Sequence, residues 1–158
     1  MSRFFLVLSI MLVIDTYGLC QTLTGKEQQD IIRQIRQTLD NYVKDVKSGG
    51  LTAEFKYLDS SADFFWVPPG YQSAISYDSV ASVLKQNAPK FKSVENIYDS
   101  LRIIPLTKHF ASYTARVSST MTDIAGAISK TSLVETGILI RRKDGWKLLN
   151  GQTNIISK

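Results

Sequence analysis

Hydrophobic residues change their spacing once along this chain, from a helical period in the N-terminal half to alternation in the C-terminal half. In the first half, apolar side chains recur every three or four positions, at Ile31, Ile32, Ile35, Leu39, Tyr42, Val43 and Val46. This spacing predicts one long amphipathic helix with a single buried face. Thr24 and Glu27 have the spacing of a capping box at its start, and Gly49-Gly50 predicts its end.

Shorter elements are expected between the long helix and the alternating half. Leu51, Phe55 and Leu58 recur at helical spacing and predict a second, shorter helix. The aromatic run 64–67, stopped by Pro68-Pro69-Gly70, is typical of a short strand leading into a turn. A third helix is then expected to begin near position 78 and to end before position 89, which is a proline.

The C-terminal half alternates and predicts long strands over 94–104, 110–121 and the hairpin 133–154. The hairpin turns at Lys143-Asp144-Gly145, because Asp-Gly supplies the positive φ that such turns need. A two-residue loop at Asp144-Gly145 would set Glu135 opposite Asn154. A three-residue loop would instead set Thr136 against Gln152, so the turn decides which way Glu135 points.

Helices followed by a meander of antiparallel strands predict an α+β fold. We expect N-terminal helices packed on the concave face of a curved antiparallel sheet, a cystatin-like cone around a pocket. The chain has 158 residues, which suits one domain over 21–158 after an N-terminal signal peptide over 1–20. Arg3 before the short apolar run 4–14 has the form of such a signal, so a secreted or periplasmic location is expected.

Cys20 is the single cysteine and lies at the expected cleavage site. A cut before it would allow lipid modification, but bacterial lipoprotein signals carry a small residue where this chain has Leu19. Membrane contact is therefore expected only if Cys20 is lipidated. A cut after it would leave no thiol for a disulfide or a metal.

Charge and motifs narrow the possible functions. The net charge is +5, but lysine and arginine are scattered among acids, so nucleic acid is not an expected partner. With His109 as the only histidine and no clustered acids, no metal site is expected, and no phosphate-binding or hydrolase motif predicts a cofactor or nucleotide.

The order of elements resembles the nuclear transport factor 2-like superfamily. The resemblance rests on Gly49-Gly50-Leu51, the strand and turn 63–70 and the closing 144–148, and covers most of the chain, from about Glu27 to Asn154. It is strongest toward the exported SnoaL-like and ketosteroid-isomerase-like branch. This resemblance implies a cone-shaped fold, a frequent homodimer and a pocket that serves different purposes in different members.

Few functional residues of that branch carry over to this chain. Tyr42 matches the tyrosine that donates a hydrogen bond to the forming enolate in ketosteroid isomerases. Val67 stands where those enzymes have their general base, and it cannot accept a proton. Asn150 and Gln152 stand at the alternate positions where SnoaL-like proteins often have histidines. Amides bind ligands but do not titrate, so this replacement favours binding over catalysis.

Three hypotheses remain open from the sequence. The first is an exported, homodimeric domain that binds an unknown small molecule without catalysis, in a pocket lined by Tyr42, Trp66, Tyr113, Asn150 and Gln152. The second is an isomerase, dehydratase or cyclase that uses a pocket carboxylate; the candidates for its catalytic residue are Glu135, Asp63 and His109, of which His109 more simply lies in an exposed loop. The third is a structural or partner-binding dimer module.

Overall fold

The helices of this protein lie mainly in its N-terminal half, as the spacing predicts. The computed structural model describes residues 22–156. Helix α1 spans Gly25–Gly49, a 3₁₀ helix η1 spans Leu51–Tyr57, α2 spans Tyr77–Asn87, and a short 3₁₀ helix η2 spans Ala88–Lys90. The predicted capping box is present at the start of α1: the Thr24 hydroxyl accepts from the Glu27 amide, and the Glu27 carboxylate accepts from the Thr24 amide.

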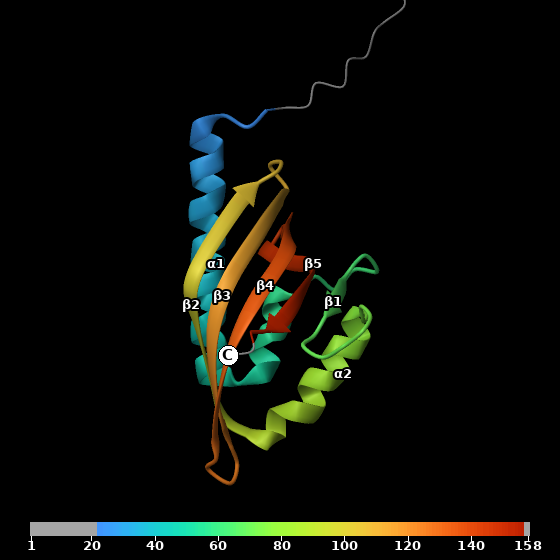
Figure 1. Cartoon of the computed structure of the whole chain (residues 1–158). Coiled ribbons are helices and arrows are strands. Elements are labelled where there is room, and N and C mark those ends of the chain that lie inside the picture. Colours follow the sequence, from blue (N-terminus) through green and yellow to red (C-terminus); the bar gives the residue numbers. More distant parts are fainter. Residues whose placement is uncertain (1–21, 157–158) are drawn as a thin grey trace, which may run out of the picture.

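Five strands form one curved sheet in the order β1-β5-β4-β3-β2. They span Phe65–Val67, Phe91–Pro105, Phe110–Asp123, Ile128–Arg142 and Gly145–Ile155 for β1 to β5. Strand β1 runs parallel to β5, and the other neighbours are antiparallel. Figure 1 shows α1 running along the β2 and β3 side of the sheet, with α2 beyond β1 and β5. The predicted α+β fold is confirmed.

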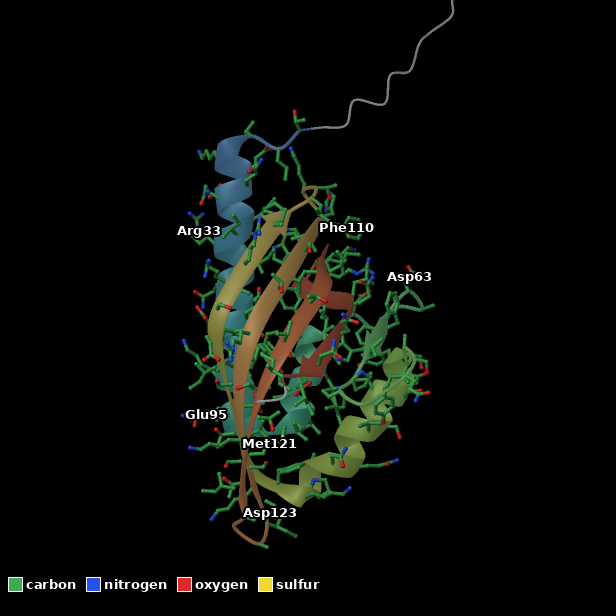
Figure 2. The ribbon with its side chains drawn as sticks, viewed as in Figure 1. Arg33, Asp63, Glu95, Phe110, Met121 and Asp123 are labelled. Atoms are coloured by element: carbon green, nitrogen blue, oxygen red, sulfur yellow. The ribbon has the colours of Figure 1, made fainter. Side chains whose placement is uncertain are left out.

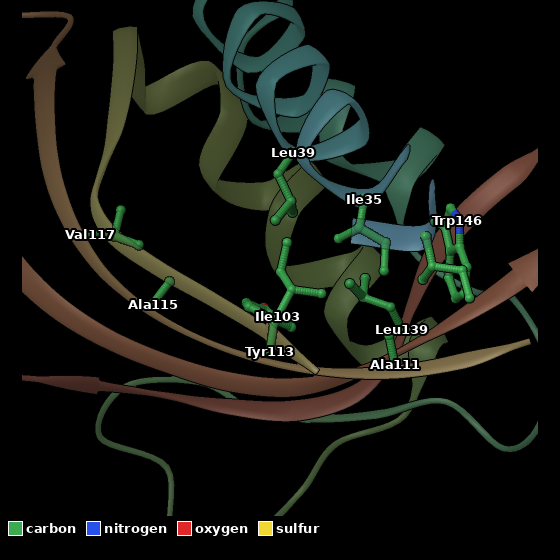
Figure 3. Packing of buried hydrophobic residues seen from close by; sticks show 10 residues of the cluster. Ile35, Leu39, Ile103, Ala111, Tyr113, Ala115, Val117, Leu139 and Trp146 are labelled. Atoms are coloured by element: carbon green, nitrogen blue, oxygen red, sulfur yellow. The ribbon is translucent and has the colours of Figure 1, made fainter. Parts of the chain in front are cut away.

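The core lies between α1 and the concave face of the sheet. Ile35 and Leu39 extend from α1 toward Ala111 and Tyr113 on β3 (Figure 3), and all four side chains are buried. The same periodicity that predicted the helix therefore selects its buried face. Burial of these apolar side chains fixes α1 across the sheet and closes one wall of the space behind it.

A β-bulge interrupts the pairing of β5 with β4. The hairpin turn consists of Lys143 and Asp144, with Arg142 opposite Gly145, whose φ is 120°. Pairing runs regularly to Leu139 opposite Leu148 and then shifts, so that Ile138 faces Asn150 and Leu149 is the extra residue. The loop has two residues, as in one of the expected alternatives, but it lies at Lys143-Asp144 and not at Asp144-Gly145. Beyond the bulge the register sets Thr136 against Gln152, which is the pairing expected for a three-residue loop.

Close packing around Gly151 gives a testable consequence for stability. A Cβ at this position would lie 2.5 Å from Trp66 Cζ3 and closer still to the backbone oxygen of Thr136. We expect Gly151→Ala to lower the free energy of unfolding by about 1–3 kcal/mol, because neither neighbour can move without disturbing the sheet. Urea unfolding measures the change. The control is Gly25→Ala, where a Cβ would meet nothing within 4 Å; equal stability of the two variants would contradict the prediction.

Some sequence-based expectations fall outside the described residues. The signal peptide over 1–20 and the lipidation question at Cys20 lie there, so both stay predictions. Within residues 22–156, no helix is both long and apolar enough to cross a membrane.

Candidate functional site

A cavity of about 480 Å³ opens between the sheet and the helices. Side chains from α1, η1, α2 and all five strands line it, and most are aliphatic or aromatic. Its volume lies within the range of about 300–1,000 Å³ that is typical of small-molecule sites. The few polar side chains on its wall therefore decide what chemistry it can support.

Glu54 reaches the cavity because η1 is a 3₁₀ helix. Such a helix has three residues per turn, so Leu51, Glu54 and Tyr57 share one face, and all three line the cavity. An α-helical period, expected from the sequence over this segment, groups Leu51 with Phe55 and Leu58 instead. Glu54 was therefore missed as a candidate.

Glu135 reaches the same cavity from the opposite wall, on β4. It pairs with Ala115 on β3 and with Thr153 on β5, and both of these partners are buried on the concave face. Directly opposed residues in antiparallel strands lie on the same face of the sheet, so the Glu135 side chain points inward. Its place on the cavity wall agrees with this register.

Both carboxyl groups are held in surroundings that disfavour their charge. Burial, and then the charge of Glu135, raise the pKa of Glu54 to about 7, against an offset from hydrogen bonding by Tyr42. Burial also raises the pKa of Glu135 to about 7, and hydrogen bonding by Tyr113 offsets part of that rise. Near neutral pH the cavity can therefore hold one carboxylate and one carboxylic acid together.

Three tyrosine hydroxyls stand beside the two acids. Tyr42, Tyr98 and Tyr113 line the cavity, and burial together with the nearby glutamate charges raises the pKa of each well above its usual value. They remain protonated at neutral pH and can donate hydrogen bonds. The Tyr42 hydroxyl also accepts a long hydrogen bond of 3.5 Å from Asn96 Nδ2.

The residues expected to bind a ligand divide into two groups. Tyr42, Trp66 and Tyr113 line the cavity. Asn150 and Gln152 do not: they lie on the opposite face of β5, and Gln152 is exposed. Their expected placement was wrong because the bulge at Leu149 breaks the alternation that runs from Trp146 through Leu148. Thr153 lines the cavity in their place.

The other two candidate catalytic residues lie away from the cavity. Asp63 is exposed before β1, at the outer edge of the molecule in Figure 2, and His109 is exposed in the turn before β3. Neither lines the cavity wall. Among residues 22–156, no three His, Cys, Asp or Glu side chains gather in a way that could hold a metal ion.

Comparison with known proteins gives the fold and leaves the family open. No family model matches the sequence, and no curated protein matches it. A proposed scytalone dehydratase from Novosphingobium aromaticivorans superimposes with a TM-score of 0.73 at 9% identity, over 85% of this chain and 89% of that chain. This chain has the nuclear transport factor 2-like fold.

Two further structures support this conclusion. A nuclear transport factor 2-like superfamily protein from Salmonella enterica gives a TM-score of 0.65 at 12% identity, over 82% of this chain and 94% of that chain. A type 2 hexachlorocyclohexane dehydrochlorinase, LinA, gives 0.67 at 13% identity, over 85% and 90% of the two chains. At these identities the likeness concerns the fold alone.

Proposed function

We propose that this protein binds a small, largely apolar molecule in its cavity and catalyses a proton transfer on it, in the manner of an isomerase or lyase. The observation that carries the proposal is the pair Glu54 and Glu135, which approach one apolar cavity from different elements. A general base works best when its pKa is near the working pH, and both carboxyl groups meet this condition. The pair thus favours the catalytic hypothesis over binding alone.

The two acids and the tyrosines suggest a division of roles. The ionised glutamate takes a proton from carbon, and the protonated glutamate or the Tyr42 hydroxyl donates a hydrogen bond to the oxygen on which charge develops. The apolar wall keeps water out and so strengthens these interactions. In many enzymes, two titratable groups in one site divide the roles of acid and base in this way.

The structural neighbours are compatible with this class of reaction. They include a proposed scytalone dehydratase and a hexachlorocyclohexane dehydrochlorinase, whose names describe elimination reactions. We extend the proposal to the ketosteroid-isomerase-like and SnoaL-like branch of the fold on this basis and on the position of Tyr42. The proposed general base comes from a different position in the fold, because this chain has Val67 where ketosteroid isomerases have their general base.

Deuterium exchange provides a test that needs no knowledge of the natural substrate. The wild-type protein is incubated in D₂O with two small carbon acids, neutral 2-tetralone and cationic phenacyltrimethylammonium, and exchange of the protons next to the carbonyl is followed by NMR. We expect acceleration of at least one compound beyond that caused by free acetate at the same carboxylate concentration. Failure to accelerate either compound would contradict the catalytic proposal.

Binding without catalysis is the second candidate function. Its support is the predominance of aliphatic and aromatic side chains on the wall, which suits an apolar ligand whatever the acids do. Binding of both compounds without exchange would favour it. A homodimer and a role as a partner-binding module stay predictions.

A further inference from the structure

The charge of the cavity wall has only one sign. Glu54 and Glu135 line it, and no lysine, arginine or histidine does so among the described residues. The rest of the chain is rich in basic residues, with 19 lysines and arginines in total. An anionic ligand would therefore meet one or two carboxylate charges, depending on pH, and no counter-charge inside the cavity, which disfavours its entry.

Aromatic rings line the same cavity as the two acids. Among the described residues, aromatic side chains from α1, η1 and the sheet line the cavity, including Tyr42, Tyr57, Trp66, Tyr98 and Tyr113. The face of an aromatic ring attracts cations, and aromatic cages are a common means of recognising quaternary ammonium groups. The same rings also supply apolar contact area for the remainder of such a molecule.

Ser119 adds an unpaired polar group to the same cavity wall. Its side chain is 4% exposed and lines the cavity from β3. Its hydroxyl has no hydrogen-bond partner among residues 22–156. An unpaired buried hydroxyl costs stability unless something bonds to it, so a polar group of a bound molecule, or a water bound beside it, would satisfy this atom.

We propose that the cavity selects apolar molecules that carry a positive charge, such as substituted amines or quaternary ammonium compounds. The charged group lies between Glu54 and Glu135, and the apolar part contacts the aromatic wall. This inference deepens the proposed function, because it names the substrate class of the same cavity and rests on that cavity being a small-molecule site.

The ionisation of the two acids links cation binding to pH. Among the described residues, the other titratable groups on the cavity wall are Tyr42 on α1, Tyr57 on η1, Tyr98 on β2 and Tyr113 on β3. The pKa of each is raised, so all four remain neutral near pH 7. Only the glutamates change charge in this range. A bound cation favours their ionised forms, so cation affinity must increase as they lose protons. A neutral ligand of the same shape gains nothing from this ionisation.

A matched pair of ligands tests the proposal. Benzyltrimethylammonium and neopentylbenzene have the same shape, but only the first is charged, and its charge does not depend on pH. The chain has two tryptophans, Trp66 and Trp146, and both line the cavity, so intrinsic fluorescence reports binding there. At pH 8 we expect the cation to bind at least about tenfold more tightly than its neutral counterpart, and to lose about tenfold in affinity by pH 5.

Variants separate charge from shape. Glu54→Gln and Glu135→Gln are each expected to weaken cation binding at pH 8 by about tenfold and to leave neopentylbenzene binding unchanged or tighter. The matched control is Glu95→Gln, since Glu95 does not line the cavity and pairs with Lys47. Equal binding of the two ligands at pH 8, or binding of neither, would overturn the proposal. Cation-selective binding without deuterium exchange would uphold it while refuting catalysis.

Discussion

Glu135→Gln is expected to slow deuterium exchange into the probe compounds by about 10²–10⁴-fold, the usual contribution of a positioned general base. An amide has the shape of the carboxyl group but cannot accept a proton from carbon. Glu54→Gln is expected to have an effect of similar size if the two acids act together. The wild-type rate should rise with pH and level off above about 7, following ionisation of these groups.

The control for this loss is again Glu95→Gln, which removes a carboxylate outside the cavity and should leave exchange unchanged. Binding of the neutral ligand neopentylbenzene, measured by tryptophan fluorescence, shows whether each cavity variant keeps its folded cavity. If both cavity variants exchanged the probes at the wild-type rate, the glutamates would have no part in proton transfer.

The same substitution is expected to make the protein more stable at alkaline pH. At pH 8 the Glu135 carboxylate is ionised in an environment that disfavours charge, and Glu135→Gln removes that charge. We expect the free energy of unfolding to increase by about 1–3 kcal/mol. This is less than the free energy that corresponds to the whole pKa shift of Glu135, because the glutamine amide is also polar and would lie at the same half-buried position.

The stability advantage of Glu135→Gln is expected to depend on pH. The pKa of Glu135 is raised from 4.5 to about 7 in the folded protein, so between these values the folded state binds more protons than the unfolded chain. The stability of the wild-type protein therefore falls as pH rises through this window, and the advantage of the variant should shrink toward zero near pH 4.5. Urea unfolding at several pH values measures both effects. An advantage that did not change with pH would contradict the explanation.

A gain in stability and a loss of activity from one substitution would show that the acid is kept for function. Cavity carboxylates that destabilise the fold are common at catalytic sites, where activity and stability oppose each other. A purely structural glutamate would show the reverse pattern, because its removal would cost stability.

The elements of this fold could be predicted because their side-chain periods are regular. Residues Ile31, Ile35 and Leu39 recur at the helical period, and the alternation of 110–121 matches the buried face of β3. These patterns arise because each turn of a helix, and every second residue of a strand, places a side chain in the core. The inward position of Tyr42, Trp66 and Tyr113 followed from the same patterns and from the family resemblance.

The site itself depends on two local departures from regularity. The 3₁₀ geometry of η1 brings Glu54 inward, and a propensity argument does not distinguish it from a short α-helix. The bulge at Leu149 turns Asn150 and Gln152 outward. One signal for it was available, since Gly151 interrupts a strand and a glycine within a strand often marks a bulge. The local backbone geometry of η1 and β5 therefore determines which polar side chains line the cavity, and the amino-acid composition does not reveal it.

The bulge in β5 also suggests how such a cavity can change its chemistry during evolution without any amino-acid substitution. One residue inserted in β4 between Ile138 and Leu139 would give Leu149 a partner and restore regular pairing with β5. The alternation would then reverse beyond that point, turning Glu135 toward solvent and Asn150 and Gln152 toward the cavity. A single inserted codon would thereby replace one of the two acids of the cavity wall with amides and leave Glu54 in place, so an insertion could change the chemistry of this cavity as much as a substitution.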